Sequence, residues 1–516
     1  MTETLKRKRA GRSGNARRTR TTAISQLPWG VPELTDAPVE PLSPEGVAAI
    51  DAAAMRVLSE IGIDFLHPDA KRHLKAAGAD VDPDSDRVRF DPAMVREFVA
   101  RAPSQFTITP RNPAHRITIG GRHQVFGNVS SPPNCSDLDR GRRVGDMEDF
   151  RNFIRLSQYF NCIHLLGGYP VEPMDVHASV RHLECIRDKL TLSDKVCHAY
   201  SLGTERVEDA MEMVRIAAGL SWAEFEATPR MFTNINSSSP LKHDWPMLDG
   251  AMRLAARGQP VFITPFTLAG AMAPVTLSGA VVQQTAEALA AVVLLQAVRS
   301  GAPVVMGSFT SNVDMKSGAP AFGTPEYMRA TQMSGQMARF YGLPLRATNA
   351  CAANCPDAQA AWESAFSLWA VQTGHANVVY HAAGWLEGGL CASFEKFIMD
   401  CETLQQLIAY NTPVGIEEAD LAVDAIADVG PHGHFFGCQH TQDRYESAFY
   451  APFLSDWRNF ESWEETGSIR TPERANVIYK KILEEFEPPA MDPGIREELD
   501  SFVERRRSEG GAPTDF

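Results

Sequence analysis

Short apolar segments recur eight times between residues 124 and 383, and each runs into small or polar residues followed by a stretch long enough to form a helix. Their first residues lie 30 to 43 positions apart, so each interval has room for one strand, one helix and two loops. Strands that alternate with helices indicate a parallel sheet. Eight such units close a (β/α)8 barrel, so we predict an α/β protein built on a TIM barrel. The segments are residues 124–129, 163–169, 195–201, 230–236, 260–266, 303–309, 344–350 and 377–383.

Periodic segments on both sides of this region predict two additions to the barrel. Before it, helices at residues 43–62, 69–77 and 92–100 and short strands at 106–109 and 116–119 indicate a small α+β cap. After it, the chain is predicted to be helical and carries an aromatic segment. We therefore expect a basic disordered leader, an α+β cap, the barrel and a C-terminal helical extension, at residues 1–40, 41–122, 123–412 and 413–516.

The residues after each apolar segment are the candidates for function, because the active site of such a barrel forms at the carboxyl ends of its strands. They are rich in aromatic and neutral hydrogen-bonding side chains and poor in Lys and Arg. A phosphate-binding barrel normally shows cations or a glycine nest after units seven and eight, and neither is seen. Loops are polar in most proteins, so an interpretation as plain loops stays open.

The charge of the chain bears on its partners. With 50 basic and 64 acidic residues the net charge is −14, which argues against a nucleic-acid partner. The first twenty residues are the exception, because they hold eight basic residues and one acidic residue. We expect a solvated disordered leader there, with an electrostatic docking arm as the alternative.

Apolar runs and cysteines indicate the compartment. The leader lacks the apolar core of a secretory signal. The longest apolar run, residues 288–295, is too short to span a bilayer, so we expect a soluble protein that makes no membrane contact. Nine cysteines, an odd number in a chain without an export signal, indicate free thiols and a cytoplasmic location.

Several motifs in a fixed order carry a resemblance to a known family. They are LSPE at 42–45, VLSEIGI at 57–63, AAGA at 76–79, RNP at 111–113, PDAQA at 356–360, GWLEGGL at 384–390, GHFF at 433–436, HT at 440–441 and WEETGS at 463–468. From about residue 40 to 490 the chain resembles the trimethylamine methyltransferase family. Members of that family are (β/α)8 proteins that move a methyl group from an amine to the cobalt of a separate corrinoid protein.

The resemblance implies a corrinoid protein as partner and a small methylated amine as substrate. It implies no permanently bound cofactor, because the corrinoid (cobalamin) is carried by the partner. Large barrel enzymes often self-associate, so a homo-oligomer is also expected.

One departure from the founding members of the family bears on the substrate. Those members carry pyrrolysine shortly upstream of the segment that matches residues 356–359, whereas residues 349–354 are ordinary here. The chain therefore resembles the branch without pyrrolysine, some of whose members demethylate glycine betaine, proline betaine or carnitine. A quaternary ammonium leaves as a neutral amine, so its displacement by Co(I) needs no covalent helper or general acid. We thus expect a quaternary methylamine, most readily a betaine, and assign no catalytic residue.

A betaine has two groups to recognise. Its quaternary ammonium has no N–H to donate, so aromatic faces and nearby carboxylates must bind it. The aromatic candidates, each of which packs equally well in a core, are Tyr169, Tyr200, Phe266, Phe309 and Trp385. The candidate donors to its carboxylate are His198, Asn234, Asn236, Asn349 and His381. Glu387 is a candidate for long-range stabilisation of the cation, and Arg346 is either a donor or half of an ion pair inside the barrel.

Two alternatives remain open at this point. Cys351 and Cys355 follow the seventh segment, with His381 in the eighth, which suggests a zinc-assisted methyltransferase. Their spacing lacks a matching second pair, so packing of small residues is the expected role and we expect no metal. The other alternative is a sensor that binds a methylated amine without turning it over.

Overall fold

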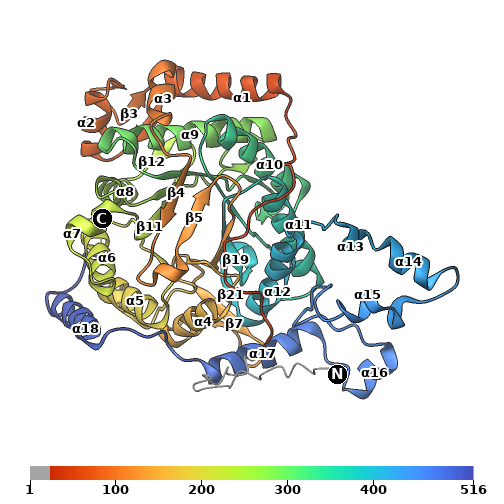
Figure 1. Cartoon of the computed structure of the whole chain (residues 1–516). Coiled ribbons are helices and arrows are strands. Elements are labelled where there is room, and N and C mark those ends of the chain that lie inside the picture. Colours follow the sequence, from red (N-terminus) through yellow and green to blue (C-terminus); the bar gives the residue numbers. More distant parts are fainter. Residues whose placement is uncertain (1–23, 515–516) are drawn as a thin grey trace, which may run out of the picture.

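The computed structural model describes residues 24–514, so most of the expected basic leader, residues 1–23, lies outside it (Figure 1). Eight parallel strands close into a barrel and follow one another around it in chain order. Each strand lies within one of the eight apolar segments, which confirms the predicted fold class. The strands are β6 (Val125–Asn128), β9 (Leu165–Leu166), β10 (Val196–His198), β11 (Met231–Ile235), β13 (Val261–Ile263), β15 (Val304–Gly307), β18 (Leu345–Thr348) and β19 (Val378–Ala383).

Helices surround the barrel, and one main helix follows each strand (Figure 1). They are α4 (Met147–Tyr159), α5 (Ala178–Leu192), α6 (Thr204–Ala217), α8 (Trp245–Ala256), α9 (Leu277–Val298), α10 (Pro325–Phe340), α11 (Ala358–Thr373) and α12 (Phe394–Tyr410). Helix α9 is long and apolar enough to cross a membrane by length and composition alone, but 83% of its most apolar window is buried inside the protein. A helix that is apolar all round is expected at the centre of a large fold.

The cap consists of helices α1 (Pro44–Arg56), α2 (Pro68–Ala76) and α3 (Pro92–Val99) and a small sheet. Its own strands are β1 (Ile63–Phe65), β2 (Asp80–Val81) and β3 (Arg87–Arg89). The fourth strand of this sheet, β12 (Lys242–His243), comes from the loop after barrel strand β11 and pairs in parallel with β1. Helices α1 and α3 pack against α9. The cap and the barrel therefore share one sheet and one packing surface.

A hairpin closes the amino end of the barrel. Strands β4 (Gln105–Ile108) and β5 (Ile117–Gly120) match the two short strands expected before the barrel. Their inward side chains pack against residues near the starts of the barrel strands: Val125, Leu165, Val196, Phe232, Phe262, Val305 and Val378. Trp29 lies against His115 and His164 at the same end, with ring centroids 4.4 and 5.1 Å apart. Residues 24–40 fall within the expected leader, so packed structure begins before residue 41.

The C-terminal part packs on the outside of the barrel, as Figure 1 shows. Helix α17 (Thr471–Glu485) lies against α12 and α4, and α18 (Pro493–Ser508) lies against α5 and α6. Between α12 and α17, residues 413–449 project from the body of the molecule.

Candidate functional site

A four-stranded sheet from the loops after the first and eighth barrel strands lies at the carboxyl end of the barrel, and we call it the lid sheet. Its strands, in spatial order, are β20 (Trp385–Leu386), β21 (Cys391–Ser393), β7 (Asn134–Asp137) and β8 (Gly141–Val144). It joins units that are far apart in the sequence. It thereby places Trp385 and the two glycines after Glu387 over the barrel mouth.

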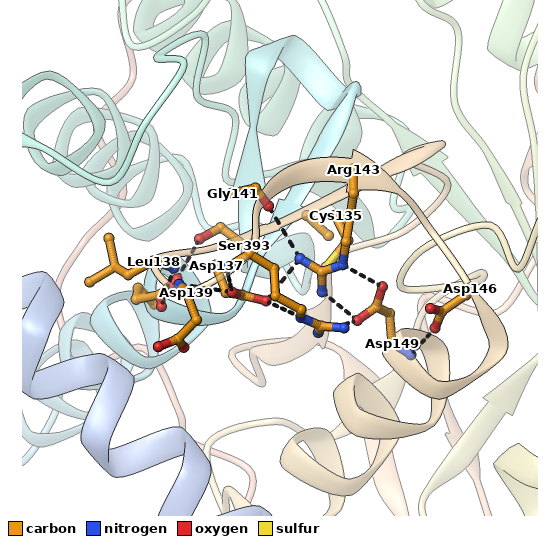
Figure 2. A network of polar contacts seen from close by, with 12 residues as sticks. Cys135, Asp137, Leu138, Asp139, Gly141, Arg143, Asp146, Asp149 and Ser393 are labelled. Carbon is orange, nitrogen blue, oxygen red and sulfur yellow. Dashed lines mark hydrogen bonds and ion pairs between the residues drawn. The ribbon is translucent and has the colours of Figure 1, made fainter.

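Buried ion pairs fix the lid sheet (Figure 2). The side chains of Asp137 and Asp149 are fully buried, and Arg143 contacts both, at 2.8 and 2.5 Å. Arg140 also contacts both carboxylates, at 3.2 and 2.9 Å. Because two guanidinium groups balance two carboxylates, the β7–β8 hairpin is held against helix α4 without an uncompensated buried charge.

A cavity of about 370 Å³ lies at the barrel mouth. Eight of the eleven candidate side chains line it: His198, Tyr200, Asn234, Asn236, Phe266, Phe309, His381 and Trp385. The other lining residues are Ser130, Ser131, Met247, Arg346, Tyr380, Gly388 and Gly389. The volume fits a small organic molecule, and the described residues that line the cavity include no carboxylate.

Three candidate residues lie outside this cavity. Tyr169 lines a neighbouring cavity of about 470 Å³, and its ring packs edge-on against that of Tyr200, which borders both cavities. Asn349 is buried, and its amide donates to the carbonyl of Ala382 at 3.0 Å. Glu387 forms an ion pair with Arg142 of β8 at 2.9 Å. Its charge is therefore neutralised within the lid sheet.

Aromatic rings form one wall of the mouth cavity. The ring centroid of Phe309 lies 4.8 Å from Phe266 and 6.1 Å from Trp385. The ring centroids of His381 and Trp385 are 4.0 Å apart, and those of Tyr200 and His198 are 5.0 Å apart. Rings that meet in this way offer faces and edges to a ligand, and a cation is attracted to the faces.

The two histidines of the cavity are neutral donors. The Nε2 atom of His198 accepts the backbone N–H of Asn234 at 3.3 Å, so its neutral ring carries the proton on Nδ1. The Nδ1 atom of His381 accepts the backbone N–H of Ser130 at 3.1 Å, so its proton is on Nε2. Burial holds the pKa of both histidines well below its usual value. Both rings therefore present an N–H but no charge at neutral pH.

Arg346 is the charged group in the cavity lining. Its side chain is buried, and Nη1 donates to the hydroxyl of Thr348 at 2.6 Å. The guanidinium carbon lies 4.7 Å from the ring centroid of Tyr380 and 5.6 Å from that of Phe309. Burial lowers the pKa of Arg346 to about 10, so the group remains a cation at neutral pH. No carboxylate of residues 24–514 is within ion-pair distance of it, so it is not half of an interior ion pair.

Four buried donors around this cavity have no hydrogen-bond partner among the described residues. They are His198 Nδ1, Arg346 Nε, the Tyr380 hydroxyl and Trp385 Nε1. Each unsatisfied buried donor costs about 1–3 kcal/mol. Unpaired donors on four residues that line one cavity suit a ligand with strong acceptor atoms, of which a carboxylate is the natural example.

Two of these donors were difficult to find in the sequence. Tyr380 lies inside the eighth apolar segment, where it resembles a core residue, and the position of Arg346 fits two roles. A cation inside an apolar strand with no acidic residue in the neighbouring segments was the available signal for Arg346. No comparable signal marks Tyr380.

The two cysteines considered as zinc ligands do not form a ligand set. Cys351 is fully buried, and burial raises the pKa of its thiol to about 12. Cys355 is exposed and contacts Asp357. Within residues 24–514 no group of three or more His, Cys, Asp or Glu side chains is arranged to hold a metal ion. The zinc-assisted alternative therefore has no geometric support.

The fold and this cavity define a class of protein, a (β/α)8 barrel with a cavity of small-molecule size at the carboxyl ends of its strands. The sequence profile described as Trimethylamine methyltransferase (MTTB) matches residues 7–511. The chain belongs to this family and is a methyltransferase.

Individual relatives are similar over most of the chain. The glycine betaine methyltransferase of Desulfitobacterium hafniense strain Y51 is 36% identical over 91% of this chain and 98% of its own length. The proline betaine:corrinoid methyltransferase of Eubacterium limosum is 28% identical over 76% and 82%. The trimethylamine methyltransferase MttB of D. hafniense strain DSM 10664 / DCB-2 is 27% identical over 91% and 94%.

A solved structure, the monomethylamine methyltransferase of Methanosarcina barkeri, aligns with a TM-score of 0.48 at 11% identity, over 91% of this chain and 89% of that one. The barrel is established by the strand pairing and not by this weak likeness.

Proposed function

We propose that the chain transfers a methyl group from a betaine-type quaternary amine to the Co(I) of a separate corrinoid protein. The observation that carries this proposal is the group of four unpaired donors, Arg346 among them, beside the aromatic wall of one cavity. A betaine carries a carboxylate and a methylated ammonium a few bonds apart. Its carboxylate would satisfy the donors while its ammonium faces the rings.

The proposed methyl transfer needs little chemical participation by protein side chains. Transfer breaks the C–N bond, whose electron pair stays on nitrogen, and an electron pair from cobalt forms the new bond to the methyl carbon. The amine leaves neutral, so no proton has to move. The protein's part is to hold the methyl group toward the mouth and to exclude water. The neutral rings of His198 and His381 suit this role, because they donate hydrogen bonds and are poor acids.

The seventh unit supports a quaternary rather than a tertiary amine. Residues 349–354 contain only ordinary amino acids, and Asn349 does not line the cavity but bonds the carbonyl of Ala382. An unprotonated tertiary amine would have to leave as an amide anion unless a side chain activated it. No Asp or Glu among the described residues lines the cavity to do so. The betaine substrates named for two relatives agree with this choice.

Other features support the partner and the compartment. The Eubacterium relative is a proline betaine:corrinoid methyltransferase, which supports a corrinoid-carrying partner here. All nine cysteines are free in the structure, and eight of them are buried, which suits the reducing cytoplasm.

The test is methyl transfer from defined donors. The purified chain is mixed with cob(I)alamin, alone or on a corrinoid protein, and with glycine betaine, proline betaine, carnitine or trimethylamine, and the cobalt spectrum is followed. We expect methyl-cobalt to form from at least one of the two betaines and not from trimethylamine. Transfer from trimethylamine alone would contradict the leaving-group argument. Calorimetric binding of a betaine without any methyl-cobalt would favour the sensor.

A further inference from the structure

The projecting part of the chain, residues 413–449, which we call the arm, makes almost no contact with its own barrel. It contains α13 (Glu418–Leu421), α14 (Val423–Val429), η4 (Phe435–Gly437) and α15 (Gln439–Gln442), and none of these four elements buries a residue. The chain rejoins the body at Tyr450, whose hydroxyl donates to Glu402 of α12 at 2.9 Å. Figure 1 shows the arm extending beyond α11 and α12.

The arm is nevertheless apolar. Nine of its large hydrophobic side chains are 44 to 88% exposed: Val414, Ile416, Leu421, Val423, Ile426, Phe435, Phe436, Tyr445 and Phe449. A cavity of about 740 Å³ opens among α13, α14 and α15, and no side chain of residues 24–514 fills it. Helices this short are not stable in water by themselves, and clustered exposed apolar groups mark interfaces. The arm therefore requires a partner surface.

The body of the same chain has a second apolar surface next to the root of the arm. Trp362, Phe366 and Trp369 lie at i, i+4 and i+7 on one face of α11 and are 41 to 53% exposed. Tyr410, the last residue of α12, packs on Trp369 at 5.6 Å and is itself half exposed. We call these four residues the aromatic stripe. An amphipathic helix normally turns such a face toward the core, so this face also requires a partner.

We propose that a second copy of this chain covers both surfaces, with the arm of each copy lying on the aromatic stripe of the other. Because arm and stripe are neighbours on one chain, a two-fold axis lets both contacts form at once and closes the assembly as a dimer. Residues 413–430 carry five acidic and no basic residues, so two arms laid against each other would repel. The single charged residue of α11, Glu363, is buried and bonds the backbone of Ala352, so α11 offers the arm no exposed like charge, and Asp36 is the acidic residue that contacts the stripe, through Tyr410.

The position of the arm favours a second copy over the corrinoid protein. Methyl transfer requires the acceptor at the barrel mouth, where α12 begins beside lid strand β21. Tyr410 lies at the other end of α12, where its hydroxyl donates to Asp36 at the amino end of the barrel. The arm thus leaves the body at the end opposite the mouth.

The experiment is sedimentation of the full chain, with variants in each surface. We expect a dimer of twice the 56.7 kDa chain mass at micromolar concentration. Phe436→Ser with Phe449→Ser in the arm, or Trp362→Ser with Phe366→Ser in the stripe, should each weaken dimerisation by about a hundredfold or more. Val477→Ser, at an equally exposed position on α17, is the matched control and should leave the dimer intact.

Mixing distinguishes arm exchange from other dimers. A dimer of one arm variant and one stripe variant retains one intact contact, whereas each variant alone retains none. The mixture should therefore contain more dimer than either variant alone. Circular dichroism and methyl transfer per chain, which these residues do not touch, verify that the variants are folded. A monomeric wild-type chain, a dimer that survives both sets of substitutions, or an arm that binds only the corrinoid protein would overturn the proposal.

Discussion

Arg346 is the main evidence for a substrate that carries a carboxylate. A buried cation without an acidic partner destabilises a fold, and the hydroxyl of Thr348 and two aromatic rings offset only part of that cost. Such a group is retained where a ligand supplies the missing charge. Under the proposed function, Arg346 is therefore the residue that distinguishes a betaine from a plain tetraalkylammonium ion.

Replacing Arg346 tests this role. Arg346→Met should lower the affinity for glycine betaine by about 10- to 150-fold, because a hydrogen bond to a charged group contributes about 1.5–3 kcal/mol. Affinity for tetramethylammonium, which lacks a carboxylate, should not fall. Calorimetry with the two ligands measures the difference. Arg346→Lys retains the charge but lacks the planar guanidinium, so its affinity for glycine betaine should lie between those of the wild type and Arg346→Met. Arg56→Met, on the exposed face of α1, is the control. An equal loss for both ligands would show that the variant disturbs the cavity as a whole.

For single residues, the sequence predicts which positions lie near the site better than it predicts which way their side chains point. Eight candidate residues line the cavity because they stand at strand ends, where a barrel builds its site. Consecutive residues of a strand normally point to opposite faces, yet Tyr380 and His381 both line it. The pairing of β19 with β6 is irregular at this point, and His381 has a φ of 52°. A bulge of this kind depends on tertiary packing and leaves no sequence signal.

The β7–β8 hairpin shows how an inserted element is fixed at a site. Its pairing with β21 brings residues 134–136 alongside residues 391–393, and the ion pairs of Arg140 and Arg143 with Asp149 of α4 attach it to the body. Nothing in the local sequence indicates this pairing, since the partner strand belongs to the eighth unit. The ion pair of Glu387 is equally hard to predict, because Glu387 belongs to the eighth unit and its counterion Arg142 belongs to the first unit.

Removing one cation from this network tests its contribution. Arg143→Ala leaves two fully buried carboxylates with Arg140 alone, so the free energy of unfolding should fall by about 3 kcal/mol. Urea unfolding followed by circular dichroism measures it. Arg142→Ala on the same strand removes a half-exposed arginine and should cost at most about 1 kcal/mol. Similar losses in the two variants would mean that burial does not determine the strength of these pairs.

Element by element, the barrel was the predictable part. Its strands are buried on both faces, so they read as continuous apolar runs, and their spacing reveals the helices between them. The shortest elements and the segments without regular structure are not predictable. Strand β12 has two residues, and the packing of residues 24–40 rests on contacts such as Trp29 with His164. Such contacts join distant parts of the chain and leave no periodic pattern.

For the whole molecule, buried neutral histidines make stability depend on pH. His164 accepts the backbone N–H of Phe126 and contacts the carbonyl of Gly30 at 3.0 Å. Burial, with nearby Lys195 acting in the same direction, lowers the pKa of His164 to about 3. The unfolded chain binds this proton below about pH 6.5 and the native chain does not. The native state therefore loses stability as the pH falls from 6.5 toward 3, and this histidine contributes no pH dependence above that window.

His164→Gln should flatten this dependence, because Gln offers an acceptor and a donor but cannot bind the proton. Between pH 6 and 4.5 the slope of the unfolding free energy against pH should decrease by about 1.4 kcal/mol per pH unit, the equivalent of one proton. Urea titrations at several pH values give the slope. The exposed His434→Gln is the control and should leave it unchanged. His198 and His381 should maintain the remaining slope.

The sheet shared by the cap and the barrel constrains the order of biosynthesis. Strand β1 leaves the ribosome early, but its parallel neighbour β12 follows only after four of the eight barrel strands have been synthesised. Until then the nascent cap has an open strand edge, a place where growing chains can pair wrongly. The cap is therefore not an independent module that matures first. Its sheet is completed only when half of the barrel has emerged.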